Sequence, residues 1–257
     1  GILRRGGNAV DAAVAVGFAL AVTLPRAGNI GGDGFMLVHD AKTGAQVVFD
    51  FRSVAPKAAT LSLFLDAQGK ESKLAGQGYL APSVPGTVAG FAMAHKKFGK
   101  LAWADVVAPA IALARDGVTL SPDEAFVFGW GKERLSTSAA AKLAYFKADG
   151  ALYRAGETLK QPDLAWTLTQ IAERQADGFY KGPVAERIVA DMKANGGLIT
   201  MEDLAAYRAV ERRPLRGTYR GLDIVTPPPA SAGGATLLNM LNIVENFDLK
   251  ASGLGSA

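Results

Sequence analysis

The pattern of apolar and polar positions changes its period along the chain, and it begins with a helical stretch. From residue 9 to about Val22 the sequence is rich in Ala and Val, with apolar side chains almost all round a helical wheel. Asn8 is a suitable N-cap for this helix, and Pro25 cannot continue it. A helix that is apolar on nearly all sides is expected to be buried on most of them.

Two apolar runs that we interpret as β-strands follow. They cover residues 35–38 and 46–51, and the polar, glycine-containing residues 42–44 between them are typical of a hairpin turn. Side chains alternate between the two faces of a strand, which divides the second run into two sets. One face is expected to carry Val47, Phe49 and Phe51, and the other Val48, Asp50 and Arg52.

Residues from about 86 to 210 are mostly helical in pattern, and a strand and a helix are expected after them. Apolar side chains recur at helical spacing in three groups, which are Phe91, Ala94 and Phe98; Leu164, Leu168 and Ile171; and Val184, Ile188 and Met192. Thr200 followed by Asp203 is typical of a capped helix start. The pattern predicts a strand at 222–225, ended by the prolines 227–229, and a final helix at about 235–245. Strand regions on both sides of a helical middle favour an α+β or layered α/β fold over a helical bundle.

The composition is that of a well-packed globular protein. Hydrophobic residues make up 49% of the 257 residues and charged residues 20%, which excludes the disordered class. One large α/β domain of this length is common, so we expect residues 1–257 to form a single domain. The net charge is +4, but Lys and Arg are scattered among Asp and Glu, and the densest cluster is only 211–213. This mixture favours a solvated surface, and no nucleic-acid partner is expected.

The absence of cysteine excludes several kinds of site, and the apolar N-terminal stretch has to be compared with an export signal and a membrane span. A chain without Cys has no disulfide, no thiolate nucleophile and no Cys-ligated metal site, although this does not identify a compartment. The apolar stretch 9–24 follows Arg4 and Arg5, as the apolar part of an export signal would. However, Asp11 interrupts this stretch, and the stretch is too short to span a bilayer comfortably. We therefore expect a buried helix and no membrane span in this chain. There is no initiator Met, so any export signal would lie upstream of this sequence.

A glycine cluster between the first helix and the first strand is a candidate ligand loop. Gly31, Gly32 and Gly34 surround Asp33, and Gly28 lies just before them. A nucleotide-binding loop would follow a strand and open a helix, whereas this cluster follows a helix and precedes a strand. Two interpretations stay open, a tight crossing of backbone segments and direct lining of a substrate pocket.

Arg52 is the main candidate for substrate binding. It lies at the end of the second strand run, where it could simply pair with Asp50. A guanidinium also offers a planar fork that matches a carboxylate with two parallel hydrogen bonds, which a Lys does not.

Three further features have ordinary structural explanations. Residues 231–234 precede a helix, so their N–H groups could bind an anion, but helix capping is the commoner use of such a sequence. His39 lies in a predicted strand and His95 in a predicted helix, and neither has the spacing of a metal ligand or a nucleophile elbow beside it. We interpret both as structural or surface residues, and no metal site is expected.

Several segments together carry a family resemblance. They are GGNAVDAA at 6–13, GNIGGDGF at 28–35, DFRSVAP at 50–56, SVPGTVAG at 83–90, NGGLIT at 195–200 and PPPASAGG at 227–234. In this order they resemble the large subunit of gamma-glutamyltranspeptidase (glutathione hydrolase), and the resemblance covers nearly the whole chain. It implies that Arg52 holds the α-carboxylate of the glutamyl substrate. Two positions depart from the pattern, since many family members have glycine at Asp33 and glutamate at Ser53.

The resemblance also implies a fold and a reaction. The fold is α+β, a layered αββα sandwich of the N-terminal-nucleophile hydrolase type, completed by a small subunit cut from the same precursor. The reaction is γ-glutamyl transfer from glutathione or a related amide to water, an amino acid or a peptide, through an acyl-enzyme on a threonine. That threonine begins the small subunit, and no Thr-Thr-His start occurs here. We therefore expect no catalytic residue in this chain, no activity from it alone, and no metal or organic cofactor.

Two alternatives stay open, together with the compartment. One is an acylase of the same superfamily acting on a cephalosporin side chain, with the same scaffold and a different acyl pocket. The other is a non-catalytic amino-acid-binding scaffold that keeps Arg52 without a self-cleaving threonine. By resemblance the protein is expected in the periplasm or outside the cell.

Overall fold

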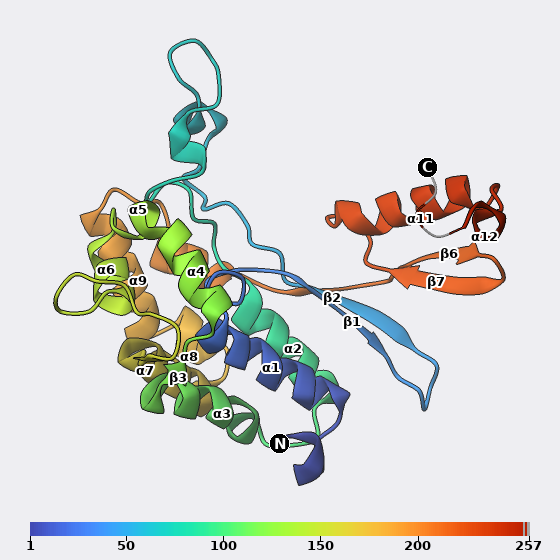
Figure 1. Cartoon of the computed structure of the whole chain (residues 1–257), viewed down its shortest axis with the longest axis horizontal. Coiled ribbons are helices and arrows are strands. Elements are labelled where there is room, and N and C mark those ends of the chain that lie inside the picture. Colours follow the sequence, from blue (N-terminus) through green and yellow to red (C-terminus); the bar gives the residue numbers. More distant parts are fainter. Residues whose placement is uncertain (254, 256–257) are drawn as a thin grey trace.

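The computed structural model describes residues 1–253 and 255, and it divides into a helical body and a C-terminal unit. Figure 1 shows the helices of the body packed together, with a strand hairpin and the C-terminal unit extending to one side. Among the described residues, no helix combines the length and apolar character needed to cross a membrane.

The first helix, α1 (Ala9–Thr23), begins where the sequence predicts. The Asn8 side chain accepts a hydrogen bond from the Asp11 N–H at 3.0 Å, and the Asp11 carboxylate accepts one from the Asn8 N–H at 2.8 Å. This reciprocal pair satisfies two N–H groups that a helix start leaves free. Phe18, fully buried on α1, meets the rings of Phe91 and Trp103 edge-on at 5.2 and 5.6 Å. The centre of the core therefore lies against α1.

The helix α1 is buried on most sides, as expected, but one stripe of it is open. Val16 and Leu20 are 55% and 37% exposed, on a stripe of the helix that also exposes Ala9 and Ala13. The helices α2 (Thr87–Phe98) and α3 (Trp103–Asp116) pack on the opposite side. An apolar stripe of α1 is thus left uncovered by the described residues.

The helical middle is confirmed, with one interruption. The further helices of the body are α4 (Pro122–Trp130), α5 (Lys132–Leu135), α6 (Ala139–Tyr145), α7 (Pro162–Arg174), α8 (Asp177–Tyr180), α9 (Pro183–Ala194) and α10 (Met201–Ala206). Short 3-10 turns are η1 (Leu3–Arg5), η2 (Leu61–Phe64) and η3 (Lys73–Ala75). The sequence did not predict a small antiparallel pair, β3 (Val118–Thr119) with β4 (Thr158–Leu159), because two-residue strands have no readable period.

A three-stranded antiparallel sheet lies beside the helices. The predicted hairpin is β1 (Phe35–His39) with β2 (Gln46–Asp50), and the unpredicted β5 (Val210–Arg212) pairs with the other edge of β2. The predicted alternation is confirmed on its helix side, where Phe49 and Phe51 meet rings of α2 at 6.0 and 5.7 Å. This packing fixes the end of β2, where Arg52 follows.

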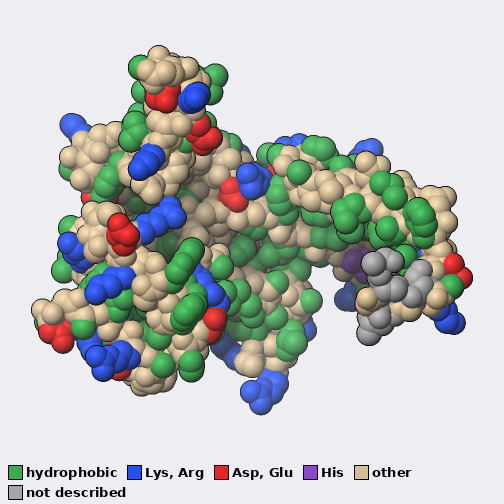
Figure 2. All heavy atoms as spheres, turned by 45° about the horizontal axis from the view of Figure 1, so that its top comes forward, with side chains coloured by type: hydrophobic (Ala, Val, Ile, Leu, Met, Phe, Trp, Pro, Cys, Tyr) green, Lys and Arg blue, Asp and Glu red, His purple; other side chains and the backbone are tan. Residues whose placement is uncertain are grey.

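The C-terminal unit is built from a hairpin and a helix. The strands are β6 (Leu215–Tyr219) and β7 (Leu222–Thr226), and α11 (Ala232–Val244) packs on them, followed by α12 (Leu249–Ser252). The strand and helix predicted here are β7 and α11, while β6 was not predicted. Only Gly234 of α11 is buried. Figure 2 shows hydrophobic side chains gathered over this unit.

Candidate functional site

Arg52 is held by its backbone at the end of β2. Its N–H donates to the Asp50 carboxylate at 3.0 Å, and its carbonyl accepts from the Tyr207 hydroxyl at 2.8 Å. Neither bond uses the guanidinium. The backbone is therefore fixed while the cationic end of the side chain stays available.

The guanidinium is half exposed and faces one carboxylate. The Arg52 side chain is 53% exposed, and its NH1 lies 3.4 Å from Asp33 Oδ1. The other Asp33 oxygen accepts from the Ser53 N–H at 3.0 Å and from the Ser53 hydroxyl at 2.5 Å. The structure thus brings Arg52 together with Asp33 and Ser53.

The simple alternative, an ion pair between the Asp50 and Arg52 side chains, is not what the structure contains. Asp50 is 6% exposed, and its second oxygen accepts from Arg212 Nε at 2.5 Å. Arg212 lies on β5, directly across the ladder from Val48. Because the Asp50 carboxylate is committed to Arg212 and to a backbone N–H, it organises the strand end and leaves the Arg52 guanidinium to other partners.

Two stacked tyrosines support this arrangement from behind. The Tyr207 and Tyr180 rings lie 5.6 Å apart and nearly parallel, and the Tyr180 hydroxyl donates to the Pro85 carbonyl at 2.7 Å. Burial, together with the negative charges of Asp50 and Asp33, raises the pKa of Tyr207 far above its usual value. Its hydroxyl therefore stays protonated and donates a hydrogen bond to the Arg52 carbonyl.

The glycine-rich segment makes the tight backbone crossing that was one of its two interpretations. The Gly32 carbonyl accepts from the N–H groups of Gly86 and Thr87 at 2.8 and 3.1 Å, and the Gly34 carbonyl accepts from Phe51 N–H at 3.0 Å. A Cβ at Gly86 would lie 2.0 Å from the Phe51 carbonyl oxygen. Only glycine permits so close an approach.

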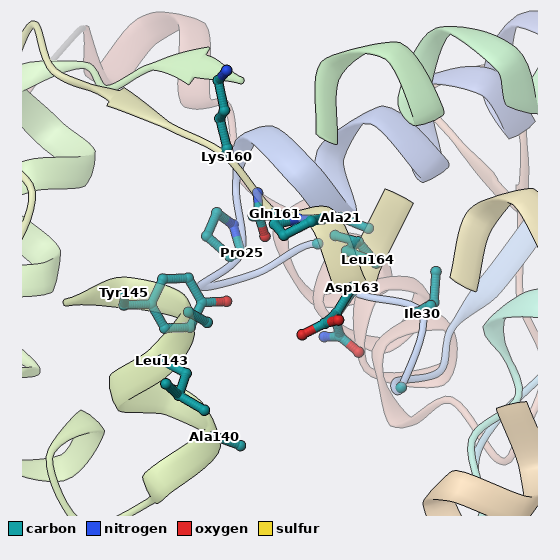
Figure 3. Close-up of a pocket in the computed structure, with 15 residues that line it drawn as sticks. Ala21, Pro25, Ile30, Ala140, Leu143, Tyr145, Lys160, Gln161, Asp163 and Leu164 are labelled. Atoms are coloured by element: carbon teal, nitrogen blue, oxygen red, sulfur yellow. The ribbon is translucent and has the colours of Figure 1, made fainter. Parts of the chain in front are cut away.

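The same segment also lines a cavity. The cavity has a volume of about 490 Å³ and is bordered by residues 28–31, by α6 and by the start of α7. Figure 3 shows the Tyr145 ring of α6 and the Asp163 carboxylate of α7 on opposite sides of it. Burial raises the pKa of Tyr145, so this hydroxyl is a neutral group on a mostly apolar wall. Arg52 is not one of the lining residues.

The remaining candidates lie apart from Arg52. Ser231 occupies the N-cap position of α11, but its side chain makes no capping hydrogen bond, so the capping expected there is absent. His39 is exposed at the end of β1. His95 lies on α2 with Nε2 3.0 Å from the Leu101 carbonyl, next to Asp11 and Trp103. Both histidines thus occupy the surface or structural positions that we predicted.

Sequence reasoning missed Tyr207 and Arg212. Each contacts the strand end from more than 150 residues away along the chain. The only local signal was the charge cluster 211–213, in which Glu211 pairs with Lys97 and Arg212 with Asp50. Among the described residues there is no group of three or more His, Asp or Glu side chains placed to hold a metal ion.

The chain has clear relatives among known proteins. A family model described as Gamma-glutamyltranspeptidase matches residues 1–257. The chain belongs to the gamma-glutamyltranspeptidase family. It is 50% identical to a glutathione hydrolase proenzyme of Escherichia coli (strain K12) over 258 residues, which is 100% of this chain and 44% of that protein. The chain thus spans less than half of that relative.

Solved structures agree over the same residues. The crystal structure of Helicobacter pylori gamma-glutamyltranspeptidase superposes with a TM-score of 0.97 at 48% identity, over 100% of this chain and 73% of that one. A cephalosporin acylase from Bacillus halodurans superposes with a TM-score of 0.84 at 32% identity, over 96% of this chain and 46% of that one. These neighbours confirm the predicted α+β fold class of the N-terminal-nucleophile hydrolase type, of which this chain is a part.

Proposed function

We propose that this chain is the part of a γ-glutamyltransferase or glutathione hydrolase that holds the substrate's α-carboxylate. The observation that carries the proposal is the state of Arg52, whose backbone is fixed at two points while its guanidinium is half exposed. A guanidinium in this state can take a carboxylate in two charge-assisted hydrogen bonds.

The rest of the site would come from the remainder of the protein. A threonine at the start of a small subunit, cut from the same precursor, would attack the γ-carbonyl, and water, an amino acid or a peptide would release the acyl group. Arg52 takes no part in bond making. Its contribution is orientation, since holding the α-carboxylate places the γ-carbonyl at a fixed distance from the nucleophile. The proenzyme name of the Escherichia coli relative supports this two-subunit arrangement.

The test is Arg52→Lys in the complete processed enzyme with two matched substrates. For γ-glutamyl p-nitroanilide we expect kcat/KM to fall by about 10-fold or more, roughly 1.4 kcal/mol, because Lys keeps the charge but loses the fork. The 4-aminobutanoyl p-nitroanilide lacks only the α-carboxylate, so the variant should process it as well as the wild type does. Arg115→Lys, in an exposed ion pair with Asp116, is the matched control.

The same kinetics separates the alternatives. Equal losses on both substrates would mean that Arg52 serves the fold and does not bind the substrate. An acylase acting on a cephalosporin side chain would prefer that amide over γ-glutamyl amides, and the similarity to the Bacillus halodurans acylase keeps this candidate in view. A non-catalytic scaffold would bind glutamate through Arg52 but would turn over neither anilide.

The 257 residues by themselves should be inactive, because the nucleophile of the proposed reaction lies outside them. Turnover of γ-glutamyl p-nitroanilide above the uncatalysed rate, by chain shown to be free of small subunit, would contradict this. In the complete protein the C-terminal unit would join the body in one domain, covered by the small subunit. A periplasmic or extracellular location is part of the same proposal, and cell fractionation with a cytosolic marker enzyme tests it.

A further inference from the structure

The contact between Asp33 and Arg52 has a geometry that an ordinary surface ion pair lacks. Most exposed pairs join two long, mobile side chains and contribute little. Here the carboxylate is held rigidly, because Asp33 is 22% exposed at its side chain and one oxygen takes two hydrogen bonds from Ser53. The other oxygen is thereby aimed at the Arg52 guanidinium.

The backbone on both sides of Asp33 is fixed as well. The Gly32 carbonyl is bound by the first residues of α2, and the Gly34 carbonyl is bound by the Phe51 N–H. Asp33 is therefore attached to the same segment that ends in Arg52, and to the start of α2. No other acidic side chain of the described residues lies within 4 Å of the Arg52 guanidinium.

We propose that Asp33 is a positioning residue that holds Arg52 ready for the substrate's α-carboxylate. This rests on the proposed function, since it concerns how Arg52 binds. An unrestrained Arg side chain loses rotamer freedom when a ligand orders it, and that loss weakens binding. Asp33 imposes the order beforehand through one nitrogen and leaves the other guanidinium N–H groups for the ligand.

The two departures from the family pattern meet in this contact. A glutamate at position 53 would place a carboxylate beside Arg52 from the same strand end, whereas in this chain Asp33 brings one from the neighbouring loop and Ser53 secures it. In either arrangement a carboxylate lies beside the guanidinium. The two positions should therefore compensate for one another.

The experiment uses the complete processed enzyme and the two anilides described above. Asp33→Asn keeps the size of the side chain but removes its charge, and we expect the KM for γ-glutamyl p-nitroanilide to rise by about fivefold with kcat within about twofold. KM and kcat for 4-aminobutanoyl p-nitroanilide should stay unchanged. Added to Arg52→Lys, the Asp33 substitution should have no further effect, because it acts through the guanidinium. Asp116→Asn, the carboxylate of an exposed ion pair elsewhere, is the matched control.

A second experiment moves the carboxylate from position 33 to position 53. Asp33→Gly alone should raise KM as Asp33→Asn does, and Asp33→Gly combined with Ser53→Glu should return it to within about twofold of the wild type. If Asp33→Asn interferes with folding or self-processing, Ser53→Ala keeps the carboxylate and removes one of its hydrogen bonds, and a smaller rise in KM is expected.

The outcomes distinguish this inference from the proposed function. An unchanged or lowered KM in Asp33→Asn, or a swap no better than Asp33→Gly, overturns the positioning role while a selective Arg52→Lys effect leaves the proposed function in place. Equal losses of Arg52→Lys on both anilides overturn the proposed function, and the role of Asp33 with it.

Discussion

The helical body and the C-terminal unit differ in how far they bury their apolar side chains. In the body, Phe18, Leu168 and Ile171 are completely buried in one continuous core. In the C-terminal unit, α11 exposes Met240 and Ile243 by 58% and 59% although its sequence is strongly apolar. The body therefore has a closed core of its own, although it also exposes Phe126, Trp130 and Leu143. The C-terminal unit has no such core, and its apolar face gains stability only when something covers it.

The two regions differ in how much of their apolar surface the described residues cover. The Arg52 end of β2 rests on the closed core through Phe51, which meets Phe91. Apolar surface is left open on the stripe of α1, on α4 and α6, and on the face of α11. The solved Helicobacter pylori structure, with a TM-score of 0.97, has the same arrangement of the chain. Substitutions in the two regions should therefore respond differently to the presence of the missing part.

The largest effect is expected at the centre of the body. Phe18→Ala would remove a ring that contacts two others and leave a cavity, which costs about 3–5 kcal/mol of unfolding free energy. Phe126→Ala is the control, since that ring is 72% exposed on α4 and its loss should cost no more than about 0.5 kcal/mol. Urea unfolding of the chain measures both, and similar costs would show that the core is not closed.

A smaller loss is expected where the glycine segment crosses the strand end. A Cβ at Gly86 would lie 2.0 Å from the Phe51 carbonyl oxygen and 2.2 Å from the Tyr207 hydroxyl, so Gly86→Ala should destabilise the chain by about 1–3 kcal/mol. It should also lower activity on γ-glutamyl p-nitroanilide in the complete enzyme, because both groups hold the Arg52 backbone. Gly76→Ala is the control, since nothing lies within 4 Å of a Cβ there.

In the C-terminal unit the effect should depend on the missing part. Ile243→Ser should leave the unfolding of this chain unchanged, since the side chain is exposed and the two residues have similar helix propensities. In the complete protein it should cost about 1.5–3 kcal/mol, the value of one buried aliphatic side chain. Asn242→Ser, a polar exposed neighbour, should have little effect in either form. Equal melting of wild type and Ile243→Ser in the complete protein would show that nothing covers this face.

Solubility follows from the same contrast. The chain by itself should aggregate, because it has open strand edges and an uncovered apolar helix face. Ile243→Ser combined with Met240→Ser should raise its solubility, as measured by the protein remaining after centrifugation. A wild-type chain that stays monodisperse at concentrations well above those of the unfolding experiments would contradict this prediction.

The sequence predicted the features that depend on neighbouring residues. Asn8 with Asp11, Thr200 with Asp203, and the hairpin before Arg52 all follow local rules of capping and turns. The strand β5 was missed because three residues carry no period. Likewise, nothing near Arg52 indicated Tyr207, which reaches it from 155 residues away.

The candidate site was predictable to the same extent. Its central residue, Arg52, was found through the family resemblance, but the partner of its guanidinium was not. The local alternative paired it with Asp50, two residues away, whereas the fold gives Asp50 to Arg212 and brings Asp33 from the preceding loop. Which carboxylate meets which guanidinium is decided by long-range packing, and a single sequence does not contain that information.

The smallest effect is expected in the dependence of stability on pH, at Asp203 in the body. Burial alone would raise the pKa of this carboxyl, but hydrogen bonds from the Lys57 N–H and from the Thr200 N–H and hydroxyl outweigh burial and hold the pKa below its usual value. A lowered pKa in the folded state means that the contribution to stability is present above the unfolded value, about 3.9, and is lost as the pH falls through the folded value. Asp203→Asn should therefore melt below the wild type at pH 7, and the gap should narrow as the pH falls below about 4.

The matched control for Asp203→Asn is Asp223→Asn, which changes an exposed carboxylate on β7 of the C-terminal unit. Its melting temperature should stay with that of the wild type at both pH values, because the described residues give that carboxylate no hydrogen-bond or ion-pair partner. Thermal melting of the complete enzyme measures all three proteins side by side. If the difference in melting temperature between Asp203→Asn and the wild type stays constant with pH, the ionisation of Asp203 does not contribute to stability. If Asp223→Asn shows a difference that narrows in the same way as the pH falls, the effect is not specific to the hydrogen-bonded carboxylate of the body.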